Sequence, residues 1–264
     1  MSAEGTAQGR AGAAPRMDSP RAPRKVALFV SCVSDFAAPG PAKAAVEVLE
    51  AMGVEVELPL AQTCCGQPAL NSGYPDEARK LVRRWLRVFE PYDAVVTVSG
   101  SCAAMLHHHA ARLVAADPRA PTPVARTYEF TQFVAAFGAG LNLRLDATVT
   151  YHDSCHMARS LGERTSPREV LGRVAGLRLV EMADSDTCCG FGGTFAAKFA
   201  DVSVAMADTK LDNAEGSGVR DLVSADPGCL LHLQARAGAT GRPTRTRHIA
   251  ELLRDALVRT EVPT

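Results

Sequence analysis

Two copies of the sequence Thr-Cys-Cys-Gly, at residues 63–66 and 187–190, are the stretches best suited to chemistry. Each copy has one cysteine well upstream and one well downstream, so the eight cysteines of the chain form two quartets. The first quartet is Cys32, Cys64, Cys65 and Cys102, and the second is Cys155, Cys188, Cys189 and Cys229. Cys64 and Cys188 are 124 positions apart, which indicates an internal repeat of that period.

Four thiolates that converge on one place suit a soft metal centre, either a tetrahedral zinc ion or an iron–sulfur cluster. Zinc sites usually take their cysteines from closely spaced pairs, whereas each quartet here spans 70 or more positions. The adjacent residues Cys64 and Cys65 are poorly shaped to form a disulfide with each other. We therefore interpret each quartet as an iron–sulfur site, with zinc binding and thiol redox chemistry as the alternatives.

Gly66 and Gly190 directly follow the two cysteine pairs. A glycine lets the chain adopt a positive φ angle there, which can bring backbone N–H groups close to sulfur. This placement agrees with a metal site, although an ordinary tight turn would use glycine as well.

The segments that lead into the cysteines are predicted β-strands, because they are short, apolar and followed by turn residues. They are residues 25–31, 54–58 and 94–98 in the first half, and 147–151, 177–182 and 221–224 in the second. Helical apolar spacing between the strands predicts helices at residues 42–52, 76–89, 128–137, 167–175, 195–211 and 248–258.

Strands that alternate with helices predict parallel pairing through helical crossovers. The carboxyl ends of parallel strands meet at one edge of a sheet, which is where ligands bind in such folds. The predicted fold class is therefore α/β, with two tandem repeated units of parallel strands and the cysteines at the carboxyl ends of the strands. This arrangement gathers each quartet without a short C-x-x-C spacing.

Composition bounds the remaining possibilities. Residues 1–24 are rich in Ala, Gly, Arg and Pro and lack the apolar centre of a signal peptide, so we predict a disordered tail. The first cysteine-rich unit is then expected at residues 25–145 and the second at 146–259.

The net charge is zero, which argues against nucleic acid, and no stretch has the pattern of a membrane span. We expect a cytoplasmic protein, where thiols stay reduced.

Longer motifs surround the cysteines: TCCGQPALNSGY (63–74), SGSCAAM (99–105), YHDSCHM (151–157), TCCGFGGTFAAK (187–198) and SADPGCLL (224–231). The twin Cys…Cys-Cys-Gly…Cys pattern resembles the CCG domain found in heterodisulfide reductase and in the iron–sulfur subunit of glycolate oxidase. The longer motifs resemble the lactate utilisation protein A family, from about residue 25 to 257. The resemblance implies an iron–sulfur protein that works with lactate utilisation proteins B and C to oxidise L-lactate to pyruvate. A related 2-hydroxy acid is the alternative substrate.

The chain departs from the heterodisulfide reductase pattern at one point in each half. In that pattern the last cysteine belongs to a C-x-x-C pair, whereas here Met105 and His232 take the place of the second cysteine. Each site therefore has four cysteines, and we expect one [4Fe-4S] cluster in each quartet. His232 is either an additional ligand or a packed helical histidine.

Other histidines lie near the motifs. His152 and His156 flank Cys155, where they either hydrogen-bond to cluster sulfur or serve only the local turn. Three consecutive histidines at 107–109 are predicted on a helix, where successive side chains point about 100° apart. They cannot chelate a metal together, so we interpret them as surface or packing residues.

No flavin or nicotinamide signature is present in the sequence. Lactate oxidation removes two electrons and two protons, and the hard step is usually the work of a cofactor. We therefore expect an electron-transfer subunit and assign no catalytic residue. The alternatives are a thiol/disulfide redox subunit of the heterodisulfide reductase type and a zinc-stabilised scaffold for partner proteins.

Overall fold

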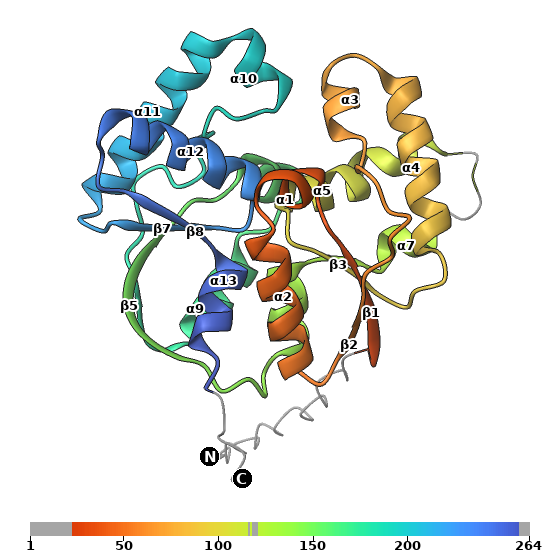
Figure 1. Ribbon diagram of the computed structural model, residues 1–264, viewed down its shortest axis with the longest axis horizontal. Coiled ribbons are helices and arrows are strands. Elements are labelled where there is room, and N and C mark those ends of the chain that lie inside the picture. Colours follow the sequence, from red (N-terminus) through yellow and green to blue (C-terminus); the bar gives the residue numbers. More distant parts are fainter. Residues whose placement is uncertain (1–22, 116, 118–120, 259–264) are drawn as a thin grey trace, which may run out of the picture.

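A computed structural model describes residues 23–115, 117 and 121–258 (Figure 1). Residues 1–22 of the predicted tail lie outside the described residues. The chain forms two α/β units in succession, each built on a four-stranded parallel sheet. The strands are β1 Lys25–Phe29, β2 Glu55–Glu57, β3 Val95–Thr97 and β4 Thr127–Glu129, then β5 Arg144–Tyr151, β6 Ala175–Leu179, β7 Asp221–Ser224 and β8 Arg245–His248.

Helices connect the strands and cover the sheets. In the first unit they are α1 Cys32–Ala37, α2 Gly40–Ala51, α3 Gln67–Asn71, α4 Pro75–Phe89, α5 Gly100–Ala104, the π-helical turn η1 Met105–Ala110, α6 Ala111–Leu113, α7 Pro121–Ala125 and α8 Phe130–Phe137. In the second they are the π-helical turn η2 His156–Ser160, α9 Thr165–Gly172, α10 Thr194–Lys198, α11 Ala200–Gly216, α12 Pro227–Thr240 and α13 Ile249–Ala256.

Both sheets have the same strand order, β2-β1-β3-β4 and β6-β5-β7-β8. The direction of winding reverses between the first and third strands of each unit, and such a switch point opens a crevice at the carboxyl ends of the strands. The predicted fold class, two tandem α/β units with parallel strands and cysteines at strand ends, is confirmed. The six predicted strands correspond to β1, β2, β3, β5, β6 and β7.

Helix α4 shows how local sequence sets an element. Pro75 occupies the first turn, where a backbone N–H is not needed, and Asp76 and Glu77 place negative charge at the positive end of the helix dipole. The buried residues recur at helical spacing: Ala78, Val82, Trp85, Leu86 and Phe89. Burying a side chain such as Phe89 stabilises the fold by about 1.5–3 kcal/mol, so this face fixes the helix on its sheet.

The fourth strand of each sheet is absent from the sequence prediction. Residues 128–137 are predicted as one helix, but Tyr128 belongs to β4 and the helix begins at Phe130. Both fourth strands are short and run straight into a helix, and the polar sequence of β8 (RTRH) gives no apolar signal. Glu129 and His248 end these strands and cap the helices that follow.

A second correction concerns residues 195–211, which are predicted as one helix. The structure has two, α10 and α11, because the backbone leaves the helical region at Phe199 (φ −128°, ψ 54°). Within the described part of the chain, no helix has both the length and the hydrophobicity needed to cross a bilayer.

One hydrophobic core cluster contains residues of both units, and each unit has a further cluster of its own among the described residues. Helix α2 of the first unit packs beside α13 of the second in the centre of the molecule (Figure 1), and α8 packs against α9. Two contacts tie the sheets together: the His248 ring Nε2 lies 3.1 Å from the Val98 carbonyl oxygen, and the Gly100 N–H donates to the Ala225 carbonyl at 3.1 Å. The carboxyl ends of β3 and β7 therefore lie close together.

Candidate metal centres

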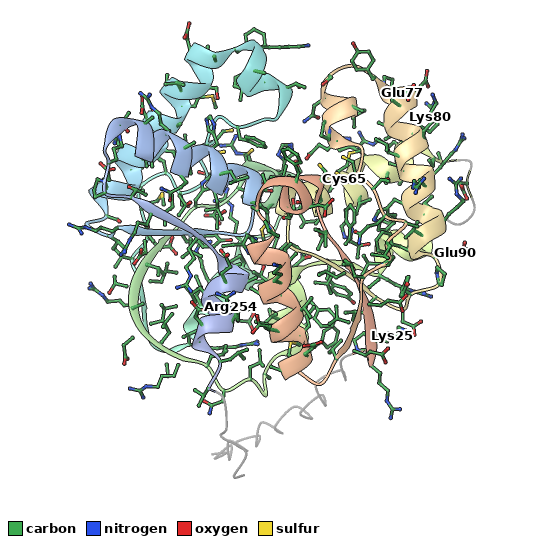
Figure 2. All side chains as sticks on the ribbon, in the orientation of Figure 1. Lys25, Cys65, Glu77, Lys80, Glu90 and Arg254 are labelled. Carbon is green, nitrogen blue, oxygen red and sulfur yellow. The ribbon has the colours of Figure 1, made fainter. Side chains whose placement is uncertain are left out.

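The first quartet gathers at the switch point of the first sheet. Cys32 begins α1 after β1, the Cys64-Cys65 pair follows β2, and Cys102 lies on α5 after β3. The Cys32 and Cys64 sulfur atoms are 3.7 Å apart, and the Cys65 thiol contacts those of Cys64 and Cys102. Cys32 is exposed, whereas Cys65 and Cys102 are buried. Figure 2 shows Cys65 near the centre of the molecule, while Lys80 projects from the outer face of α4.

Short polar contacts fix the backbone around this quartet. Ser31 and Ser99 accept hydrogen bonds from the backbone N–H groups of Ser34 (3.1 Å) and Cys102 (3.3 Å), and so cap α1 and α5. Gly66 has a φ of 93°, and a β-carbon there would lie 3.1 Å from the Ala78 carbonyl oxygen. This conformation lets the Gly66 N–H donate to the Cys64 sulfur at 3.4 Å.

The second quartet repeats this construction on the second sheet. The Cys155 and Cys188 sulfur atoms are 3.8 Å apart, and the buried Cys189 thiol contacts Cys188 and Cys229. Gly190 has a φ of 89°, and its N–H donates to the Cys188 sulfur at 3.5 Å. Both cysteine pairs thus carry the N–H···S contact that the glycine placement predicted.

Asp226 caps α12 and also joins the two units. Its Oδ1 accepts hydrogen bonds from the N–H groups of Gly228 (3.1 Å) and Cys229 (3.5 Å). Its Oδ2 accepts from the Ser101 N–H, in the first turn of α5, at 2.9 Å. One buried carboxylate therefore orients the helices that carry Cys102 and Cys229.

The two quartets face a single cavity of about 130 Å³. Among the residues that line it are seven of the eight cysteines: Cys32, Cys65, Cys102, Cys155, Cys188, Cys189 and Cys229. The eighth, Cys64, lines a neighbouring groove together with Leu58 and Leu60. Residues from both units thus converge on one space between the sheets.

The thiols perturb one another. Hydrogen bonds from Cys32 and Cys65 lower the pKa of Cys64 to about 3, and those from Cys155 and Cys189 lower the pKa of Cys188 to about 2. These hydrogen bonds favour the thiolate form of the first cysteine in each adjacent pair, which is the form that binds metal. Hydrogen bonding to Cys102, followed by that to Cys64, raises the pKa of the Cys65 thiol, which is also fully buried.

The donor set fits a soft metal. Four sulfur ligands per site are typical of zinc and of iron–sulfur clusters. Two thiolates bound to one tetrahedral metal atom at about 2.3 Å stand about 3.8 Å apart, which matches the two sulfur pairs above. The clustered cysteines thus indicate metal binding in each unit.

The side chains behind the two quartets differ. Phe29 and His152 occupy equivalent positions, three residues before Cys32 and Cys155. Trp85 and Lys210 are also equivalent, because each lies seven residues after the helical residue against which Gly66 or Gly190 packs. In the first unit the Phe29 and Trp85 rings pack edge to face with centroids 6.2 Å apart, and Phe89 completes the aromatic group.

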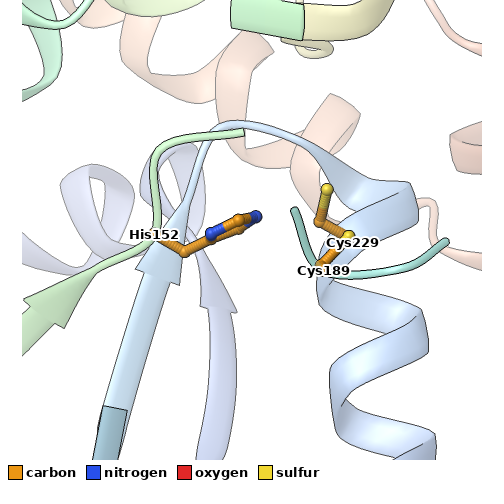
Figure 3. Close-up of side chains that lie close together, drawn as sticks. All are labelled: His152, Cys189 and Cys229. Carbon is orange, nitrogen blue, oxygen red and sulfur yellow. The ribbon is translucent and has the colours of Figure 1, made fainter. Parts of the chain in front are cut away.

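The second unit has polar groups at these positions. His152 is fully buried, and a ring nitrogen lies within 4.8 Å of the Cys189 and Cys229 sulfur atoms (Figure 3). Among the described residues, neither ring nitrogen has a hydrogen-bond partner. Lys210 is also fully buried, and its Nζ donates to the carbonyl oxygens of Asp184 (2.6 Å) and Ser185 (3.1 Å). Burial, and then the charge of Lys210, lower the pKa of His152 to about 4, so the imidazole is neutral.

The other predicted histidines are placed differently. His156 lines the cavity, with its Nδ1 3.7 Å from the Cys155 sulfur. His232 instead contacts the Ser203 hydroxyl at 3.2 Å and packs near the Phe191 ring. The three histidines at 107–109 lie in η1 and do not line the cavity; the His107 ring contacts the Thr127 carbonyl oxygen at 2.9 Å.

Sequence reasoning missed Lys210 and Asp226. Lys210 falls on the buried face of α11, whose other members are Ser203, Ala207, Leu211 and Ala214. A lysine at this apolar spacing is the signal that would have found it. Asp226 has the pattern of an ordinary helix cap, and nothing in the sequence indicates its contact with Ser101.

Comparisons with known proteins agree with this geometry. A model of the cysteine-rich domain family CCG matches residues 26–107 and 149–234. A protein named Lactate utilization protein A, from Exiguobacterium sp. (strain ATCC BAA-1283 / AT1b), is 43% identical over 240 residues, covering 88% of this chain and 98% of the relative. The protein of the same name from Geobacillus thermodenitrificans is 45% identical over 239 residues, covering 87% and 98%.

One solved structure has a similar fold. The crystal structure of a hypothetical protein from Helicobacter pylori aligns with a TM-score of 0.69 at 12% sequence identity. The alignment covers 93% of this chain and 52% of that one. This likeness concerns the fold alone.

Proposed function

This chain belongs to the lactate utilization protein A family of CCG cysteine-rich proteins, and we propose that it is the iron–sulfur electron-transfer subunit of a multi-protein system that oxidises L-lactate to pyruvate. The observation that carries the proposal is the pair of thiolate quartets on one cavity. In this proposal each quartet holds one [4Fe-4S] cluster, and a related 2-hydroxy acid is the alternative to L-lactate as the substrate of the system.

A cluster accepts and releases electrons one at a time. The eight cysteines would supply the thiolates that hold the two clusters. The Gly66 and Gly190 N–H groups donate to cysteine sulfur. Burial of Cys65 and Cys189 keeps water from the inner side of each site. N–H donors aimed at ligand sulfur stabilise its negative charge. Two quartets on the same cavity would give each of the two electrons of a lactate molecule its own acceptor.

Lactate oxidation also needs a hydride or proton acceptor, which we assign to partner subunits. In this proposal they resemble lactate utilization proteins B and C, and the assembly works in the cytoplasm without a role for nucleic acid. The exposed Cys32 marks the side of the first centre that is open to a partner.

The test is metal analysis of the full chain purified without oxygen. We expect brown protein with about eight irons and about eight sulfides, which is two four-iron clusters. A double variant, Cys65→Ala with Cys189→Ala, is the control and should lose most of the iron. A folded, colourless, zinc-loaded and iron-free protein would refute the proposal.

One observation favours a second candidate, a zinc-stabilised scaffold for partner proteins. The sulfur pairs 3.7 Å and 3.8 Å apart suit two thiolates on a single zinc ion. In a four-iron cluster each thiolate binds a different iron, so the sulfur atoms would have to stand farther apart. X-ray absorption at the zinc and iron edges of the purified protein separates the two candidates.

A further inference from the structure

We propose that the two metal centres are electronically inequivalent, and that His152 and Lys210 give the second centre the higher reduction potential. The inference rests on the proposed function, since it needs a redox-active centre in each quartet. It concerns two pairs of equivalent positions at which the repeated units differ in polarity. Phe29 and Trp85 lie behind the first quartet, and His152 and Lys210 lie behind the second.

His152 is placed to act on the second centre. It is fully buried, and a ring nitrogen lies within 4.8 Å of both Cys189 and Cys229 sulfur atoms (Figure 3). Its ring nitrogens have no partner in the described part of the chain. An unsatisfied buried polar group costs about 1–3 kcal/mol, so this ring should gain a partner when the site is filled. A ring N–H donated to sulfur stabilises the reduced centre, which carries one more negative charge.

Lys210 adds a positive charge behind the same centre. Its ammonium holds the carbonyl oxygens of Asp184 and Ser185, in the loop that leads to Cys188. Two nearby carboxylates are already neutralised, because Asp153 pairs with Arg168 at 2.8 Å and Asp186 with Arg164 at 2.7 Å. No salt bridge to Lys210 is present within the described residues, so its charge acts on the cysteines through a poorly screening interior.

Two further acidic neighbours do not reverse this asymmetry. Asp184 is exposed, so solvent screens its charge. Asp226 accepts hydrogen bonds from the N–H groups of Gly228 and Cys229 in the second unit and of Ser101 in the first, and these three donors partly offset its charge. The aromatic group behind the first quartet is uncharged and offers no cation to offset it; its members are Phe29, Trp85 and Phe89. The balance of charge therefore favours reduction of the second centre.

The consequence is a direction for electrons within the chain. One electron on the reduced first centre passes to the oxidised second centre, so the first is oxidised by one electron and the second reduced by one. No bond forms or breaks in this step, and no proton is transferred. The first electron taken from an external reductant therefore resides on the second centre.

The experiment is an anaerobic dithionite titration of the full chain, followed by electron paramagnetic resonance of the reduced centres. Spectra of Cys32→Ala and Cys155→Ala assign the signals to the first and second centres. We expect the second centre to be reduced first. Lys210→Gln and His152→Phe should each lower the ratio of reduced second to reduced first centre at least tenfold, which is about 59 mV for a one-electron couple.

Matched variants separate charge and hydrogen bonding from packing. Lys210→Arg keeps the charge, and His152→Gln keeps an N–H donor, so each should retain most of the wild-type ratio. Lys80→Gln removes an exposed lysine on the equivalent helix α4 and should leave both potentials unchanged. The first centre of each Lys210 or His152 variant is an internal control, and His152→Phe carries the test if Lys210→Gln does not fold.

Equal potentials in the wild-type protein, a lower potential for the second centre, or potentials unmoved by both Lys210→Gln and His152→Phe would overturn the inference. A strongly coupled nitrogen in the spectrum of the second centre would show that His152 ligates iron, and would overturn its assignment as a hydrogen-bond donor. If the wild-type protein contains no iron, the proposed function itself has failed, which metal analysis reveals before the titration begins.

Discussion

The two units of this chain hold equivalent cysteines in equivalent places, yet their surroundings differ. Both use a glycine with positive φ after the cysteine pair, and both cap the helix that bears the last cysteine. Behind the cysteines, the first unit has aromatic rings and the second has His152 and Lys210. The ligand positions match while the supporting side chains differ, so the repeat preserves what can be bound and varies the environment of the bound group.

The largest expected effect is on metal content, when one cysteine ligand is removed from one of the two quartets. Cys65→Ala and Cys189→Ala each remove one buried thiolate from one quartet. Each variant should lose about half of the metal, because the two quartets are separate sites on separate sheets. Metal content per chain measures this directly. Loss of all metal from either single variant would show that the quartets form one shared centre.

The fourth strand of each sheet ends in a buried titratable side chain, and the pKa values of these two side chains are shifted in opposite directions. Burial raises the pKa of Glu129 to about 8 from an ordinary 4.5, and lowers that of His248 to about 4 from 6.5. Glu129 therefore binds its proton more tightly in the folded state. The contribution of this proton to the free energy of unfolding is lost as pH rises from 4.5 to 8. His248 is protonated more readily in the unfolded state than in the folded state, so the free energy of unfolding falls as pH drops from 6.5 towards 4.

Glu129→Gln should remove the fall in unfolding free energy between pH 4.5 and 8, and His248→Asn should remove the fall that occurs as pH drops from 6.5 towards 4. Each slope that disappears is at most about 1.4 kcal/mol per pH unit, which is one proton. The free energy of unfolding, from denaturant titrations between pH 4 and 8, provides the measurement. Slope changes of the same sign in both variants would contradict the assignment, because the two groups contribute slopes of opposite sign.

The smallest expected effect concerns the helix caps. Asp226→Ala removes the cap of α12 and also leaves the Ser101 N–H without its acceptor, so we expect a loss of about 2–3 kcal/mol in unfolding free energy. Ser99→Ala removes the equivalent cap of α5 alone and should cost about 1 kcal/mol. Urea denaturation of the two variants in parallel compares them. Equal losses of unfolding free energy in the two variants would mean that the contact between Asp226 and Ser101 contributes nothing to stability.

Much of the fold is predictable because local patterns carry it. The apolar run of β1 and the amphipathic face of α4 are strong signals, and such local patterns predict six of the strands. The fourth strands were missed because their pairing depends on the neighbouring strand rather than on their own residues. Polar residues such as Arg245 and Arg247 sit well on an edge strand, where one side of the backbone is unpaired.

The predictability of the sites is uneven for a related reason. The spacing of the cysteines, combined with the predicted strand ends, placed each quartet in one cluster. The histidines carry no such pattern. His152 points into the second quartet, whereas His232 turns to Ser203, and only packing distinguishes two histidines that lie equally near to a cysteine in the sequence.

The sequence by itself determined the duplicated thiolate sites, since cysteine type, spacing and strand pattern are local properties that repeat along the chain. Tertiary structure alone decided that both sites open on one cavity, because this depends on how α2 packs against α13 and on the bridge from Asp226 to Ser101. It also decided which side chains stand behind the sulfur atoms. Burial turns a lysine and a histidine, ordinary on a surface, into the groups that distinguish one Thr-Cys-Cys-Gly site from the other.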